Sequence, residues 1–275
     1  MSGQQLSDTP VRPRMSRRQR SRLVRGGMYA LFVALVVLVV VATDWERLQR
    51  GFFNWDVAKE LFPDVLTVAA RNTVIYTLVS FALGLVGGLV LALMKLSSIG
   101  PYRWLATAYI EIFRGLPALL TIFLFAFGLP IALGINVPFE PVGPGLVGLS
   151  VVAAAYMAET IRAGIEAVPR GQLEAARSLG MGRGRAMASI VIPQALRIVI
   201  PPMTNELILI IKDTSLLFIA GQTPATKELL AFGRDIATNT FNVTPIVVVG
   251  AVYLIITIPM TQLVAVLERR NRAAR

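Results

Sequence analysis

Polar and charged side chains interrupt an apolar stretch, residues 203–220, that is long enough for a membrane-spanning helix. They are Asn205, Glu206, Lys212, Asp213, Thr214 and Ser215. A charge inside a bilayer costs at least about 2.5 kcal/mol, so these groups are expected to face the interior of a helix bundle and to have partners there. A lysine among carboxylates and hydroxyls could bind a ligand that carries both charges, because each charge of the ligand would meet its opposite. Alternatively, the charges pair with one another and only fix the helix packing.

A second charged face is expected on the apolar stretch at residues 146–167. Glu159, Arg162 and Glu166 are spaced i, i+3 and i+7, so they lie on one side of a helix. Arg162 would bind a carboxylate and Glu159 an ammonium group. We therefore count Glu159 and Arg162, together with the six residues named above, as a candidate substrate path.

The composition indicates a protein with several membrane spans. Of the 275 residues, 55% are hydrophobic and only 16% are charged, and the mean hydropathy of +0.65 is too high for a soluble domain. The net charge of +11 would suggest nucleic acid as a partner of a soluble protein, but here Lys and Arg are expected on the cytosolic side of a membrane, with no nucleic acid bound. The absence of Cys and His excludes disulfides, Cys/His metal sites and histidine acid–base catalysis. We predict no catalytic residue, metal site or bound cofactor.

The hydropathy pattern predicts six transmembrane helices with both termini in the cytosol, at residues 28–43, 67–94, 109–133, 146–167, 203–220 and 245–267. Most of the 27 Lys and Arg residues then lie in cytosolic segments or within spans. The segments on the outer side of the membrane hold only Arg47, Arg50, Lys59, Lys227 and Arg234. This asymmetry agrees with the positive-inside rule.

The two ends of the chain are predicted to be basic cytosolic tails. Residues 1–27 are rich in Arg and carry two prolines, and they are expected to be disordered; residues 268–275 form a second basic tail. The first span, residues 28–43, is short, so two readings remain. It is either an additional N-terminal membrane helix or the apolar region of a cleaved signal peptide, with Val40-Val41-Ala42 as the cleavage site.

Glycines and prolines make local predictions within these spans. Gly84 and Gly88 are four residues apart and should let another helix approach closely. Pro117 removes a backbone donor and should kink the third span, which follows a cytosolic loop at residues 95–106. The double proline Pro201-Pro202 is expected to begin the fifth span rather than to lie inside a helix.

One long segment, residues 168–193, looks cytosolic and is distinctive in sequence. Gln172–Leu179 contains good helix formers, and Gly180 stands where a glycine with positive φ would end the helix. Leu173, Ala176 and Leu179 share one face of this helix. Such a small apolar face suits a groove on a partner protein.

The spacing of this segment resembles the EAA loop of ABC importer permeases. The resemblance is carried by Glu174-Ala175-Ala176, then Gly180, then Ile190 and Ile192-Pro193, with Ile192 in place of the leucine usual before the final proline. The run Glu111-Ile112-Phe113-Arg114-Gly115-Leu116-Pro117 is similar to a second signature of the polar amino acid branch, in which threonine stands at the position of Leu116. The resemblance extends over residues 67–267.

The resemblance implies a fold, a function and a set of partners. The fold would be an all-α integral membrane protein, the type I ABC importer transmembrane domain, with a five-helix core and one extra N-terminal span. The function would be ATP-driven import of polar amino acids across the bacterial cytoplasmic membrane. The partners would be a dimer of ATPase subunits, a second permease subunit (a copy or a homologue), an extracytoplasmic amino-acid-binding protein and the lipid bilayer. The coupling residues would be Gly171, Leu173, Glu174, Ala175, Ala176, Leu179 and Gly180.

The energy source distinguishes this reading from an alternative one. The sequence has no G-x-x-x-x-G-K-[ST] pattern, so ATP and Mg would be bound by the partner ATPase and not by this chain. The alternative is a secondary transporter driven by an ion gradient, with Glu206, Lys212 and Asp213 as the ion pathway. No clear inverted repeat supports it. Neither the amino acid carried nor the identity of the second permease subunit follows from the sequence.

Overall fold

The computed structural model describes residues 17–134 and 137–273, and these residues form helices joined by short loops, without a β-strand. The prediction of an all-α protein is confirmed. The chain divides into two compact units, residues 1–50 and 51–275, which are described separately.

The first unit consists mainly of α1 (Arg17–Ala42), followed by the beginning of α2 (Trp45–Phe52). The side chains described along α1 are exposed, and its apolar part coincides with the expected first span at residues 28–43. The predicted disorder of residues 1–27 is wrong from Arg17 onward, because arginine, glutamine and leucine are good helix formers and extend the apolar helix toward the N-terminus. The remainder of that tail lies outside the described residues.

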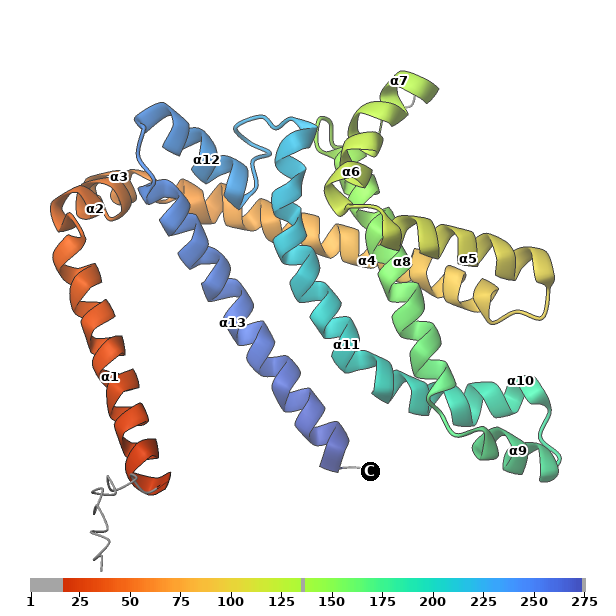
Figure 1. Cartoon of the computed structure of the whole chain (residues 1–275). Coiled ribbons are helices and arrows are strands. Elements are labelled where there is room, and N and C mark those ends of the chain that lie inside the picture. Colours follow the sequence, from red (N-terminus) through yellow and green to blue (C-terminus); the bar gives the residue numbers. More distant parts are fainter. Residues whose placement is uncertain (1–16, 135–136, 274–275) are drawn as a thin grey trace, which may run out of the picture. The chain divides into compact units, whose positions relative to one another are not determined.

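The second unit contains all the other elements (Figure 1). They are α3 (Trp55–Glu60), η1 (Val65–Ala70), α4 (Arg71–Lys95), α5 (Gly100–Gly115), α6 (Ala118–Phe123), η2 (Leu124–Gly128), α7 (Leu129–Leu133), α8 (Gly143–Glu166), α9 (Arg170–Ser178), α10 (Arg183–Ala186), η3 (Met187–Val191), α11 (Ile192–Asp213), η4 (Thr214–Ala220), α12 (Leu229–Thr240) and α13 (Thr244–Ala273).

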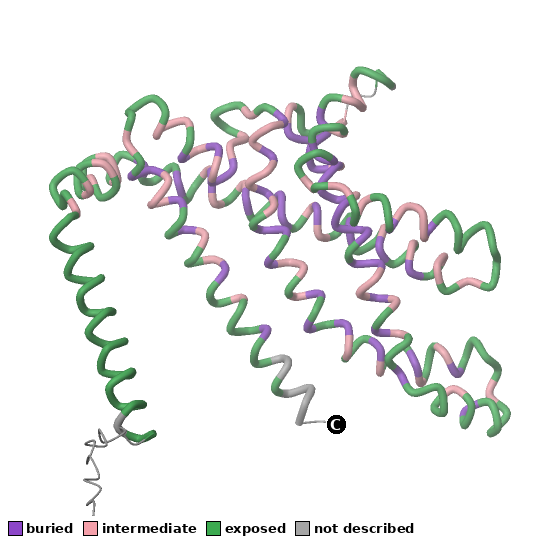
Figure 2. Tube along the Cα trace, viewed as in Figure 1, coloured by how far each residue is buried: buried purple, intermediate pink, exposed green. Residues whose placement is uncertain are grey.

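Helix α8 is the centre of this unit, since α4, α5, α6 and α11 all pack against it. Figure 2 shows buried positions on α8 along most of its length. Helix α4 approaches α8 closely: a Cβ atom on Gly84 would lie 2.8 Å from the Cβ of Ala153, and one on Gly88 would lie 2.8 Å from the Cβ of Met157. The predicted helix contact through Gly84 and Gly88 is confirmed, and α8 is the helix that they admit.

A second, smaller core lies where η1, α12 and α13 meet. It contains Leu61, Val65, Ala69, Leu229, Val249 and Val252. This core fixes the first turn of α12, because Leu229 is its first residue and is fully buried. The segment that precedes α12, residues 221–228, is therefore held at the end that leads into α12.

The observed helices reach the predicted number of six spans only if one broken pair of helices counts as a span. Five helices are long and apolar enough to cross a membrane, and a sixth span results if α5 and the helices after Pro117 are counted together. The chain bends by 107° between the two parts of that pair. The predicted kink at Pro117 is present, as a break between α5 and α6. The predicted loop at residues 95–106 is wrong in its second half, because α5 begins at Gly100 with Pro101 in its first turn.

The prolines of the fifth span and the end of the sixth also differ from expectation. Helix α11 begins at Ile192, so Pro201 and Pro202 lie inside it and do not begin it. Prolines are tolerated inside membrane helices because neighbouring groups and small adjustments of the helix satisfy the freed carbonyls. Helix α13 begins at Thr244, one residue before the expected start of the sixth span, and continues to Ala273 through most of the predicted basic tail.

Candidate functional site

The segment expected to contact a partner protein contains α9, which lies between α8 and the helices α10 and η3. Its nine residues end as the sequence predicts: Gly180 has φ +84°, its N–H donates to the carbonyl of Arg177, and the N–H of Met181 donates to the carbonyl of Ala176 at 3.1 Å. This pair of bonds is the Schellman arrangement, which satisfies the last carbonyls of the helix. The prediction of a glycine stop is confirmed.

The apolar face of α9 points into the chain itself. Ala176 is buried, and Leu173 packs against a small core formed by Val168, Val191 and Ala195. The expectation that Leu173, Ala176 and Leu179 together enter a groove on a partner is therefore wrong for the first two. Their contact with the chain orients α9, and only Leu179, with 85% of its surface exposed, remains available.

The opposite side of α9 is an exposed stripe. It consists of Gly171, Glu174, Ala175, Ser178 and Leu179, which follow the helical spacing i, i+3, i+4, i+7 and i+8. Of the seven predicted coupling residues, four lie on this stripe, Gly180 ends the helix, and Leu173 and Ala176 fix its orientation. We call these five exposed residues the α9 stripe.

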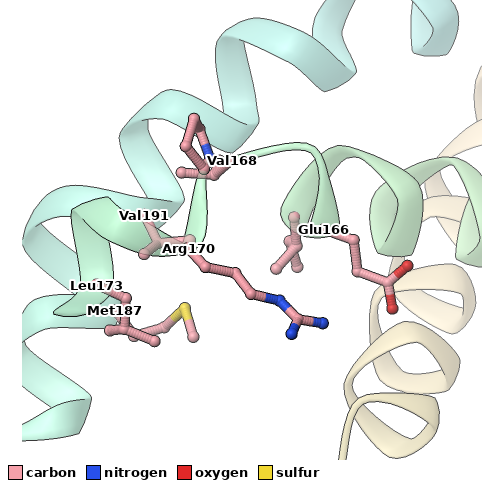
Figure 3. A pocket seen from close by; sticks show the side chains of 8 residues that line it. Glu166, Val168, Arg170, Leu173, Met187 and Val191 are labelled. Carbon is pink, nitrogen blue, oxygen red and sulfur yellow. The ribbon is translucent and has the colours of Figure 1, made fainter.

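A pocket of about 440 Å³ lies beneath α9, where the end of α8 meets η3 (Figure 3). Leu173, Met187 and Val191 supply apolar lining, while Glu166 and Arg170 supply charged groups. In Figure 3 the side chain of Arg170 extends toward the side on which Glu166 lies. Because of this pocket, α9 rests on the membrane helices through a few apolar contacts, not a continuous core.

The candidates on α8 form an ion-pair network with α4. Lys95 Nζ lies 3.1 Å from Glu159 Oε2, and Arg162 contacts both Glu159 and Glu166. Each of the two candidates thus has an opposite charge beside it, at the end of α8 that leads into α9. The structure brings Glu159 and Arg162 together but does not join them to the candidates on α11.

The candidates on α11 separate into inward and outward groups. Asp213 and Arg114 are the charged groups that interact electrostatically with the half-buried Glu206. Lys212 acts on Asp213 but is exposed, as is Asn205. The charged cluster therefore consists of Glu206 and Asp213, which are both half-buried, and of Arg114, whose side chain is exposed.

The two hydroxyls after Asp213 bond to the backbone of their own helix. Thr214 Oγ1 donates to the carbonyl of Ile211 at 2.6 Å, and Ser215 Oγ donates to that of Lys212 at 2.6 Å. Thr214 is fully buried, whereas Ser215 is partly exposed. Their protons are thus engaged, and what they offer a ligand is an acceptor oxygen.

Two residues relevant to the site were missed as candidates. The guanidinium of Arg114 lies 5.4 Å from the ring centroid of Tyr156 on α8, and its place immediately before the break at Pro117 could have indicated it. Glu228 is a fully buried carboxylate next to α12, and its position in a polar loop gave no sign of burial. Both depend on contacts between distant parts of the chain.

Comparison with known proteins identifies the family. Residues 84–273 match the model of the binding-protein-dependent transport system inner membrane component. The arginine transport system permease protein ArgU of Corynebacterium glutamicum is 35% identical over 240 residues, which cover 83% of this chain and 74% of ArgU. The probable glutamine ABC transporter permease protein GlnM of Bacillus subtilis is 36% identical over 200 residues, 72% of this chain and 89% of GlnM.

A solved structure gives the same result for the fold. An amino acid ABC transporter crystallised with histidines has a chain that matches with a TM-score of 0.71 and 34% identity, over 79% of this chain and 98% of that one. Such permease subunits have no enzymatic activity of their own. This chain is therefore a member of the binding-protein-dependent transport system inner membrane component family, the multi-pass permease subunits of ABC importers.

Proposed function

We propose that this chain is the permease subunit of an ATP-driven importer that carries polar amino acids across the cytoplasmic membrane. The observation that carries the proposal is the α9 stripe, an exposed helix face held at the end of the central helix α8. ArgU and GlnM are named for the transport of arginine and glutamine, which supports polar amino acids as the cargo. Family membership favours this function over ion-driven transport.

The α9 stripe is the proposed contact with an ATPase subunit, which would bind ATP and Mg. Leu179 offers an apolar anchor and Glu174 a charge, and the Schellman end of α9 fixes the direction of the stripe. Helix α8 continues into α9 after only three residues. A displacement of the ATPase would therefore be passed directly to the helix against which α4, α5, α6 and α11 pack.

The proposed substrate path contains Arg114, Glu206 and Asp213. Arg114 supplies a cation for the α-carboxylate, and the two acids supply carboxylates for the ammonium group. Lys212, Thr214, Ser215 and Asn205 remain at its edges as further polar contacts. For Glu159 and Arg162 we propose a different role, which is to hold α4 to α8 near the base of α9.

Three partners complete the proposed importer. A second permease subunit, either a copy of this chain or a homologue, would supply the second coupling helix for a pair of ATPases. An extracytoplasmic amino-acid-binding protein would deliver the substrate to the side of the membrane where α12 lies. The lipid bilayer would surround the exposed apolar faces of α4 and α13.

The test is uptake of labelled arginine or glutamine into vesicles that contain this chain, with and without the ATPase and ATP. Glu174→Arg should lower ATP-driven uptake at least about tenfold, because it places a cation at the centre of the α9 stripe. Arg177→Glu is the matched control, since Arg177 is exposed on α9, the substitution also reverses a charge, and the residue lies off the stripe. Uptake that follows an ion gradient without the ATPase would contradict the proposal.

A further inference from the structure

Among the residues that the structure describes, Glu228 is the one charged side chain that is fully buried, with 0% of its surface exposed. It stands at the end of segment 221–228 and immediately before α12. A buried carboxylate is costly unless several groups solvate it, and it is therefore seldom present without a role.

Three donors solvate the Glu228 carboxylate. The backbone N–H groups of Leu230 and Ala231 donate to its two oxygens, each at 2.6 Å. The hydroxyl of Tyr253 on α13 donates to Oε2 at 3.2 Å. Glu228 thus caps the N-terminus of α12 and connects it to α13.

Two buried threonines extend this contact to α4 and α11. The N–H of Leu229 donates to Thr73 Oγ1 at 3.1 Å, and the Tyr253 hydroxyl also interacts with Thr73 and Thr214. Thr73 and Thr214 are both fully buried. Thr214 follows Asp213 directly in the sequence. The interactions that begin at Glu228 therefore reach the residue next to the Arg114–Glu206–Asp213 cluster.

The segment that carries Glu228 is bound along one side of α4. Asn72 Nδ2 donates to the carbonyls of Ala225 and Lys227, at 2.8 and 3.0 Å. The hydroxyl of Tyr76 donates to the carbonyl of Thr226 at 2.8 Å. These bonds form only while segment 221–228 lies against α4, so the segment has a closed position that depends on the groups around Glu228.

No strong cation faces this carboxylate in the described part of the molecule. The titratable and charged groups around it are Tyr76 of α4, Tyr253 of α13 and Arg234 of α12, and the influence of Arg234 is minor. Lys227 forms an ion pair of 2.7 Å with Asp235. Burial therefore prevails over the hydrogen bonds and raises the pKa of Glu228 to about 7.

We propose that Glu228 is a positioning residue, a proton-controlled latch that holds segment 221–228 against α4 and, through Tyr253 and Thr214, fixes the end of α11 beside Asp213. Protonation keeps the latch closed, and ionisation favours its release. The consequence for transport rests on the proposed function, because the latch would then control the approach to the charged cluster from the side of α12. The latch itself requires no partner protein.

The size of the effect follows from proton linkage. In the released segment, Glu228 is in water with its ordinary pKa of about 4.5, whereas in the closed segment the pKa is about 7. Closure is most favourable below pH 4.5 and becomes less so as the pH rises toward 7, because the open form loses its proton first. The opening equilibrium should rise about 30-fold between pH 5.5 and pH 8.5.

The test uses single cysteines, because the natural chain has none. Leu229→Cys places a thiol at the fully buried first residue of α12, and Ala225→Cys places one at an exposed position of segment 221–228. The full chain in nanodiscs is labelled with a maleimide, and the Leu229→Cys rate is divided by the Ala225→Cys rate at each pH. We expect this ratio to rise about 30-fold from pH 5.5 to pH 8.5.

The matched variant is E228Q, which carries no charge and, like the protonated carboxyl, keeps one carbonyl acceptor. In an E228Q background the labelling ratio should be independent of pH and remain at its low-pH value. A ratio that is flat with Glu228 present, or that rises equally in E228Q, would overturn the proposal.

Hydrogen exchange keeps the proposal testable if the cysteine variants do not fold. In the otherwise unmodified chain, the amides of Leu230 and Ala231 should lose protection about 30-fold over the same pH range, after correction for intrinsic exchange. Amides in the middle of α8 serve as the internal control. If the protection of Leu230 and Ala231, relative to that of the α8 amides, were the same at both pH values, the latch would be overturned. The proposed importer function would be untouched by that result.

Discussion

Replacing Gly88 by alanine tests the contact on which the bundle is built. The added Cβ would lie 2.8 Å from the Cβ of Met157, 3.0 Å from the nitrogen of Ala158 and 3.1 Å from the carbonyl oxygen of Ala154. Two of these three atoms belong to the backbone of α8 and cannot rotate away. Helices α4 and α8 must therefore move apart by a few tenths of an ångström.

Two opposing terms determine the size of the loss. Alanine is the better helix former by about 1 kcal/mol. Overpacking of a tight contact costs about 1–3 kcal/mol, and a contact limited by backbone atoms should fall in the upper part of that range. We expect Gly88→Ala to lower the free energy of unfolding by about 1–2 kcal/mol.

Gly250→Ala is the matched control. Gly250 lies inside α13, and no atom lies within 4 Å of the position that an added Cβ would take, so the substitution should stabilise the chain by about 0.5–1 kcal/mol. The two variants are compared by thermal unfolding of the purified full chain in the same detergent. Equal stability of the two would refute the close approach of α4 and α8.

Three further substitutions test the remaining site residues. Gly180→Ala forces a side chain to φ +84° and should cost about 1–2 kcal/mol at the end of α9, lowering ATP-driven uptake, whereas Gly182→Ala, at φ −62°, should not. Glu159→Gln leaves Lys95 without its carboxylate and leaves Arg162 only Glu166, so thermal stability should fall while the KM for uptake stays unchanged; a raised KM would return Glu159 to the substrate path. Arg114→Ala should raise that KM at least tenfold, whereas Arg103→Ala, at an exposed position on the same helix, should not; equal KM values would remove Arg114 from the path.

Features that depend on nearby sequence could be predicted. Gly180 ends α9 because a helix C-terminus needs a residue that tolerates positive φ, and that requirement is local. Gly84 and Gly88 predicted a helix contact for a similar reason, since their spacing places both on one face. The apolar spans are long enough to be recognised from composition alone.

Features that depend on a choice between two allowed arrangements could not be predicted. Both faces of α9 are compatible with a helix, and only the core of Val168, Val191 and Ala195 decides that Leu173 points inward. Pro201 and Pro202 can begin a helix or lie within one, and packing of the surrounding helices selects the second.

The charged residues illustrate the same limit. The charged residues within stretches 203–220 and 146–167 are evident in the sequence. Some of the oppositely charged groups with which they interact lie on other helices. Glu159 is paired by Lys95, 64 positions earlier, and Glu206 is approached by Arg114. Sequence spacing within one helix gives no information about such pairs.

The central position of α8 has a consequence for how the chain enters the membrane during synthesis. Within its span, α8 carries Glu159 and Arg162, which disfavour its release into lipid as a single helix. Helix α4 is made first, and it already presents the glycine face and the ammonium group of Lys95 that α8 needs. Because α4 precedes α8 in the chain, α8 can pack against α4 as soon as the insertion machinery releases it. A chain in which α4 followed α8 would be expected to insert poorly.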